Sequence, residues 1–280
     1  MSETFPVRAA EGTALVAPDG AQLVFHGINK SGSFAMSSAM RDAYALAGRD
    51  DQFLCHYFIG GSRESFAERV DSAEGPGFFV GHYLYGALKP RPNRVWVTIF
   101  RHPLPRMLSC YNWLKNKHER QEPDTPFDPL DEWCERTHGV GHSMVVQFGA
   151  GYGAHNQSLR KRLRPQDLYE LSIDALERDV SCIGLAERFE ESIFHFAALA
   201  GLPEVAPWVR DQRNPGRPLS SEIGDASRTL IEEIFEYDFK LYEYALERFA
   251  KQTAQADFGS SLEAYKARCE AEYNDRILLR

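Results

Sequence analysis

Short runs of β-branched and aromatic residues recur along this chain, and segments with a helical pattern separate them. The β-prone runs cover residues 21–28, 52–59, 94–100 and 181–185. The predicted helices cover residues 33–47, 64–72, 165–177, 187–200, 225–250 and 260–280, and a further helix begins after Pro103. Strands that alternate with helices are typical of an α/β protein with a mainly parallel sheet.

The size of the chain favours a single large domain. With 280 residues, of which 43% are hydrophobic, the chain has enough apolar surface for one substantial core. We therefore expect one domain over residues 1–280, with an N-terminal extension (1–20) and a helical C-terminal extension (251–280). No internal repeat or low-complexity segment interrupts it.

The charge and the cysteines narrow the classes of function and the compartment. The net charge of −8 argues against a general nucleic-acid binder. The five cysteines are widely spaced, without a CxxC pair, which predicts buried thiols in a reducing compartment and no zinc site. The first 20 residues have no signal-peptide core, and no run of about 18 apolar residues occurs. These features predict a cytoplasmic protein without an integral membrane segment.

The loop after the first predicted strand has the composition of a phosphate-binding turn. In LVFHGINKSGSF (23–34), Lys30, Ser31, Gly32 and Ser33 separate a buried strand from a helix. A helix N-terminus offers backbone amides to an anion, glycine allows close approach, and serine and lysine add donors. The order differs from the nucleotide-binding motif G-x-x-x-x-G-K-[ST]. The alternative is an ordinary strand–turn–helix with a lysine in solvent.

A second candidate follows the strand at 94–100. Arg101 stands at the strand end, and Ser109 lies two helical turns further along. An arginine fork and a hydroxyl are suited to gripping one phosphate. The alternative is an arginine in a salt bridge and a surface serine. Together, the two elements predict a ligand with two separated phosphate-like groups.

The segments INKSGSF (28–34) and VTIFRHPLPRMLSCYNWL (97–114) resemble the two cofactor-binding elements of sulfotransferases that use 3′-phosphoadenosine 5′-phosphosulfate (PAPS). The chain is similar to the branch that includes glycan (heparan sulfate) 2-O-sulfotransferases and bacterial sulfotransferases. GHYLYG (81–86), IGLAERFEES (183–192) and YDFKLY (237–242) resemble further motifs of that branch, in the same order. The resemblance implies a P-loop-like, three-layer α/β fold with a central, mainly parallel sheet.

The resemblance also implies roles for individual residues. The 5′-phosphosulfate side of the cofactor would be held by Lys30, Ser31, Gly32, Ser33, Phe34 and Ala35. The 3′-phosphate would be held by Arg101 and Ser109, and Arg213 lies in a late loop that would contact the nucleotide. His82 would be the general base. The sequence departs from the family pattern at Asn29, at 34–36 and at His102.

The expected activity is transfer of a sulfuryl group from PAPS to an acceptor hydroxyl on a glycan, a lipid or a small molecule. Lys30 would stabilise the leaving phosphate and His82 would take the hydroxyl proton. No metal is expected. The alternatives are a P-loop-type kinase that uses ATP and a non-catalytic nucleotide-binding protein. The basic runs at 115–120 and 160–164 are either solvated surface or contacts for an acidic acceptor.

Overall fold

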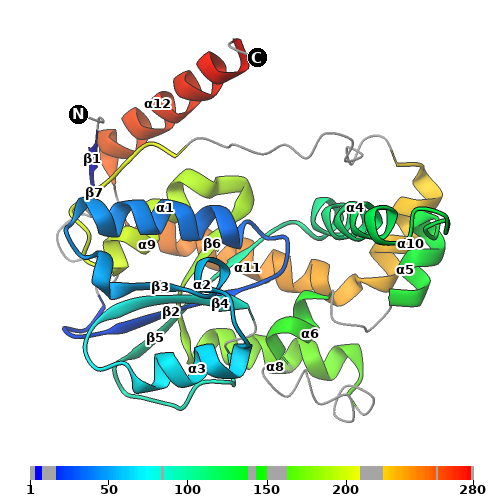
Figure 1. Cartoon of the computed structure of the whole chain (residues 1–280), viewed down its shortest axis with the longest axis horizontal. Coiled ribbons are helices and arrows are strands. Elements are labelled where there is room, and N and C mark those ends of the chain that lie inside the picture. Colours follow the sequence, from blue (N-terminus) through cyan, green and yellow to red (C-terminus); the bar gives the residue numbers. More distant parts are fainter. Residues whose placement is uncertain are drawn as a thin grey trace.

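The computed structural model describes residues 4–7, 17–82, 85–137, 143–149, 163–208, 223–256 and 258–278. At its centre is a sheet of five parallel strands in the order β3-β4-β2-β5-β6 (Figure 1). These strands are β2 (Gln22–Gly27), β3 (Phe53–Cys55), β4 (Gly77–His82), β5 (Arg94–Phe100) and β6 (Val180–Leu185). The predicted α/β fold with a parallel sheet is confirmed.

Helices connect the strands and extend beyond them. They are α1 (Ser33–Leu46), α2 (His56–Ile59), α3 (Arg63–Ser72), α4 (Pro103–Gln121), α5 (Leu130–Thr137), α6 (Met144–Gly149), α8 (Pro165–Arg178), α9 (Phe189–Leu199), α10 (Asp225–Ile234), α11 (Glu236–Gln255) and α12 (Gly259–Leu278). There are also two short 3-10 helices, η1 (Asp50–Gln52) and η3 (Ala186–Arg188). Among the described residues, no helix is long and apolar enough to cross a membrane.

Both faces of the sheet are covered, which explains why its strands are apolar throughout. Leu23 and Phe25 of β2 point into a core formed with α1 and α9. Val24, between them, points to the opposite face and packs with Phe66 and Val70 of α3. On that second face α8 and α11 pack against β6 (Figure 1). A strand buried on both sides needs an unbroken apolar run, and this is the pattern of the sequence.

The strand order places three strand ends side by side. The chain passes from β2 to β3, returns to β4, and then crosses β2 to reach β5. The carboxyl ends of β4, β2 and β5 are therefore neighbours, and His82, the loop after Gly27, and Arg101 lie at these ends. Ligands of open parallel sheets bind beyond this edge, at the point where the strand order reverses.

Two predicted elements are wrong in their extent. The strand expected over 52–59 ends at Cys55, and a single helical turn, α2, follows it. The chain leaves that turn through Gly60 and Gly61, whose φ angles of 67° and 90° favour glycine. The helix expected over 225–250 is two helices, because Phe235 between them leaves helical geometry and is buried against α4 and α5.

The two ends of the chain meet beside α9. Strand β1 (Phe5–Pro6) pairs with β7 (Glu204–Val205), and Phe5 packs edge-on against Tyr265 of α12. Tyr265 also packs on Phe194 of α9. All five cysteines are buried thiols, as predicted.

Candidate active site

The loop after β2 is held in an unusual conformation by three hydrogen bonds. Lys30 has a φ of 66°, and it is the non-glycine residue with a left-handed backbone among the described residues. Its carbonyl accepts from Nη1 of Arg101 at 3.1 Å. The amide of Ser31 donates to Ile28 (3.3 Å), and the amide of Asn29 donates to Oε1 of Gln147 (2.8 Å). Such strain is retained where surrounding contacts fix it, and it is frequent at binding sites.

The loop runs directly into the N-terminus of α1. Gly32, at a φ of 91°, caps the helix, and the first helical bond is donated by Met36 to Gly32 (2.9 Å). The amides of residues 33–35 therefore precede that first bond and lie at the positive end of the helix dipole. The hydroxyl of Ser33 donates back to the carbonyl of Ile28 at 3.0 Å, so this serine holds the loop itself.

Ser31 differs from Ser33. Its side chain is fully buried, and its Oγ has no hydrogen-bond partner within the described part of the chain. A buried hydroxyl without a partner is costly in a folded protein, and such groups point to an ion or ligand that completes them.

Helix α4 brings further polar and aromatic groups to the loop. The pKa of Cys110 is raised by burial, and the positive charges of Arg106, Lys30 and Arg101 oppose this rise. One turn along the helix, the Trp113 ring carries Nζ of Lys30 at 5.5 Å from its centroid and Nζ of Lys117 at 5.7 Å. These contacts place Lys30, Arg101 and α4 in one neighbourhood.

Ser109 lies immediately before Cys110 on α4 and is half-buried. The predicted residues Lys30, Ser31, Gly32, Ser33, Phe34 and Ala35 form the loop and the start of α1, and Arg101 contacts this loop through Lys30. Ser109 lies in the second turn of α4. Arg213 falls outside the described residues.

His82 ends β4 and lies beside the end of β2. Its Nδ1 is 2.7 Å from the carbonyl oxygen of Gly27. A carbonyl oxygen only accepts, so in the neutral ring the proton is on Nδ1 and Nε2 carries the lone pair. This is the tautomer that a general base requires if Nε2 is to take a proton.

Sequence reasoning missed Tyr57, which packs on His82 with ring centroids 4.6 Å apart. Its hydroxyl occupies the space where a side chain on Gly27 would lie: a Cβ there would be 2.3 Å from Tyr57 Oη and 3.0 Å from His82 Nδ1. Phe34 of α1 also packs against Tyr57, with ring centroids 6.3 Å apart. Tyr57 was not predicted as a site residue because its segment, 52–59, has the composition of a strand.

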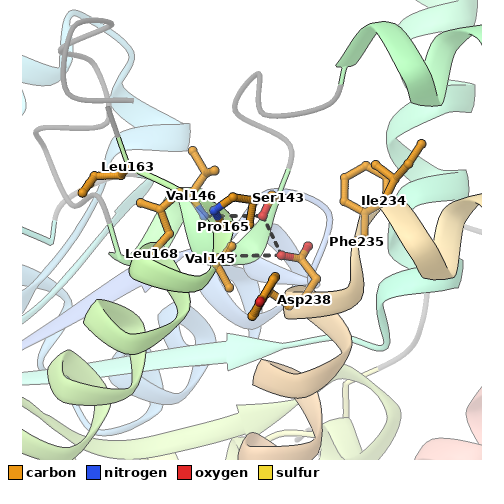
Figure 2. Close-up of a pocket in the computed structure, with 10 residues that line it drawn as sticks. Ser143, Val145, Val146, Leu163, Pro165, Leu168, Ile234, Phe235 and Asp238 are labelled. Carbon is orange, nitrogen blue, oxygen red and sulfur yellow. Dashed lines mark hydrogen bonds between the residues drawn. The ribbon is translucent and has the colours of Figure 1, made fainter. Parts of the chain in front are cut away.

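A buried ion pair supports the loop from behind. Nη2 of Arg106 is 2.9 Å from Oδ2 of Asp238, and both side chains are almost fully buried. Asp238 also accepts from the hydroxyl of Ser143 (2.6 Å) and from the amide of Val145 (3.1 Å), as Figure 2 shows. It accepts from the amide of Met144 as well (2.7 Å), so it caps α6. Gln147, near the other end of α6, accepts from the amide of Asn29 in the loop after β2.

The segment after β6 has a structural role. Glu187 accepts from the amide of His102 (3.0 Å) and from the hydroxyl of Tyr242 (2.9 Å). His102 caps α4, and burial lowers its pKa. Arg188 pairs with Glu191 of α9.

Two cavities lie beside this arrangement. One of about 180 Å³ is behind α6, and its walls are mainly apolar, with Val145, Leu168 and Phe235 among them (Figure 2). The other, of about 540 Å³, is an open groove beside His102, lined by charged residues of α10 and α11. Within the described ranges, no group of three histidine, cysteine, aspartate or glutamate residues is arranged to hold a metal ion.

Comparisons with known proteins give no family. No protein-family model matches the chain, and no curated protein matches it closely enough to count as a relative.

Proposed function

We propose that this protein is a PAPS-dependent sulfotransferase that acts on a hydroxyl group. One observation carries the proposal: Arg101 donates to the carbonyl of Lys30 at 3.1 Å. These two residues are 71 positions apart in sequence, and their contact joins the two segments that resemble the phosphate-binding elements of sulfotransferases. A ligand with two separated phosphates needs both elements at one site.

The residues of the loop fit a bound phosphate group. The buried Ser31 hydroxyl has no partner among the described residues, and the N-terminus of α1 directs its amides to the same loop. Both features favour an anion. Lys30 adds an ammonium group that would lie near the bridging oxygen, and Arg101 and Ser109 would hold the 3′-phosphate.

PAPS, when bound, supplies a sulfuryl group whose bond to the 5′-phosphate oxygen breaks while the acceptor oxygen bonds to sulfur. Lys30 and the amides at the start of α1 stabilise the negative charge on the departing oxygen. His82 Nε2 takes the proton of the acceptor hydroxyl, because its Nδ1–H is held by Gly27. The products are a sulfate ester and 3′-phosphoadenosine 5′-phosphate (PAP). The acceptor is a glycan, a lipid or a small molecule, and the cysteine pattern favours a cytoplasmic location.

The test is calorimetric titration of the protein with PAP in the absence of added metal. We expect wild type to bind PAP and the Arg101→Ala variant to bind at least about a hundredfold more weakly, which corresponds to about 2.7 kcal/mol. The matched control is Arg136→Ala, which removes an exposed guanidinium from α5. This control is expected to bind PAP as wild type does.

ATP with magnesium, and AMP, are titrated in parallel. Binding of ATP with magnesium in place of PAP would overturn the proposal and favour a kinase. If neither nucleotide binds, a catalytic role at this site is contradicted, and a scaffold protein that retains the fold becomes the better interpretation.

A further inference from the structure

Exposed aromatic side chains are concentrated at the candidate site. Among the described residues, the aromatic side chains classed as exposed are Phe34, at 60% exposed, and Trp113, at 46%. Scattered exposed aliphatic residues are normal on protein surfaces, and Leu46, Leu171 and Leu246 are of that kind. Two exposed aromatic rings that both flank one loop are not scattered, and they indicate a binding surface.

The two rings make different contacts beside the loop. Trp113 contacts its ammonium group, together with that of Lys117. Phe34 is four residues further along the chain and contacts Tyr57, which in turn packs on His82. The Phe34–Tyr57–His82 row therefore leads from an exposed apolar ring to the ring of the proposed general base.

The chemistry of this row is aromatic. Phe34 has no polar atom in its side chain, and the Tyr57 hydroxyl is turned inward to the space beside Gly27. A strongly anionic acceptor gains little from such a surface, whereas a flat apolar ring stacks on it favourably. Lys30, the cation nearest in sequence, is assigned to the phosphate.

We propose that the acceptor is an uncharged aromatic alcohol or phenol that stacks on Phe34 and Tyr57 and presents its hydroxyl to His82. This inference rests on the proposed function, because it names the acceptor of that reaction. Phe34 is a specificity residue: its backbone amide belongs to the helix N-terminus, while its side chain contacts the acceptor.

The test uses the complex with PAP, in which no reaction can occur. Protein saturated with PAP is titrated with 2-naphthol and, separately, with glucuronic acid as an anionic sugar. We expect 2-naphthol to bind and glucuronic acid not to bind at the same concentrations. The Phe34→Ala variant is expected to lose about tenfold in 2-naphthol affinity, and Phe34→Tyr is expected to retain it.

Two controls separate the possible failures. Phe34→Ala keeps the backbone amide, so its affinity for PAP should stay within about twofold of wild type. Leu171→Ala removes an exposed apolar side chain from α8 and should change neither affinity. PAP binding without 2-naphthol binding, or equal 2-naphthol affinity in Phe34→Ala, would overturn the acceptor assignment alone. Binding of glucuronic acid instead would assign the Trp113–Lys117 side to an anionic acceptor. Failure of PAP to bind would overturn the proposed function itself.

Discussion

Arg101 and Arg106 lie five residues apart and occupy contrasting surroundings. Arg106 is fully buried and pairs with Asp238, whose two oxygens also accept from a hydroxyl and two backbone amides. Arg101 is half-buried at the carboxyl end of β5, and its guanidinium donates to the backbone carbonyl of Lys30 in the loop. In the first region, both oxygens of the Asp238 carboxylate are engaged by groups inside the protein. The second collects positive charge, helix amides and a buried hydroxyl without a partner.

This difference suggests that the Arg106 region stabilises the fold and that the Arg101 region binds a ligand. A buried charge is tolerated only when it is paired and hydrogen-bonded, so the Arg106–Asp238 pair is part of the folded core. Polar groups that converge without an internal partner cost stability in the free protein, and they are retained where a ligand completes them. The same distinction predicts how variants in the two regions should behave.

The largest effect is expected at Asp238. Asp238→Ala leaves the Arg106 guanidinium buried and unpaired and removes the cap of α6. Breaking a buried pair on one side costs about 3–5 kcal/mol. We expect a loss of this size in the free energy of unfolding, measured by urea denaturation. The control is Asp42→Ala, which breaks an exposed pair with Arg41 and should cost less than about 1 kcal/mol. Equal losses in the two variants would contradict the structural role of the Arg106–Asp238 pair.

The contrast also shows which features could be predicted from the sequence and which could not. Residues 94–100 were predicted as a strand with the bounds of β5, because β-branched and aromatic residues buried on both faces leave a local pattern. Lys30 and Arg101 were predicted after strand ends for the same reason, whereas His82 was chosen from the resemblance of GHYLYG (81–86) to a sulfotransferase motif. The Arg106–Asp238 pair joins positions 132 residues apart, and no local pattern encodes it. Tyr57 was missed because its position depends on a contact that is distant in sequence. It lies in α2, and its hydroxyl occupies the space left by Gly27 of β2, which has no side chain.

The next largest effect is the pH dependence of stability that the buried histidines cause. Burial is the main cause that lowers the pKa of His26 to about 3 and that of His195 to about 4, from 6.5. Both are therefore neutral in the folded state at pH values where the unfolded chain takes up protons. The free energy of unfolding should fall as the pH drops below about 6.5, by up to about 1.4 kcal/mol per pH unit for each histidine.

This pH dependence is measured by denaturation between pH 7.5 and 4.5. His195→Gln keeps a polar group near Thr253, which contacts His195 at 3.2 Å, but does not titrate. Its unfolding free energy should decline less steeply with falling pH than that of wild type. An unchanged slope would show that His195 does not remain neutral in the folded protein.

Gly27 tests the organisation around His82. Gly27→Ala places a Cβ 2.3 Å from Tyr57 Oη and 3.0 Å from His82 Nδ1. The end of a tyrosine side chain can shift, so the stability loss should be modest, about 1–2 kcal/mol. Displacement of His82 should lower turnover with PAPS at least tenfold.

The double variant Gly27→Ala, Tyr57→Phe removes the nearest clashing atom. It should recover most of the lost stability, measured by denaturation, and part of the turnover. If the double variant is less stable than Gly27→Ala alone, the Tyr57 hydroxyl does not limit the space at Gly27.

The smallest effects are expected at the two serines of the loop, and they should have opposite signs. Ser31→Ala removes a buried hydroxyl without a partner among the described residues, so the free protein should be as stable as wild type or more stable by up to about 1 kcal/mol. Its affinity for PAP should fall about tenfold, because the ligand loses a donor.

Ser33→Ala is the matched variant, two residues away in the same loop. Its hydroxyl donates to Ile28 at 3.0 Å, so removal should cost about 1 kcal/mol of stability in the free protein. Its effect on PAP affinity should be smaller than that of Ser31→Ala, because this hydroxyl is already engaged. Denaturation without ligand and calorimetry with PAP measure both quantities on both variants. If Ser31→Ala destabilised the free protein as much as Ser33→Ala does, the Ser31 hydroxyl would be a structural group. The contrast between the buried Arg106–Asp238 pair and the candidate binding loop would then not extend to Ser31.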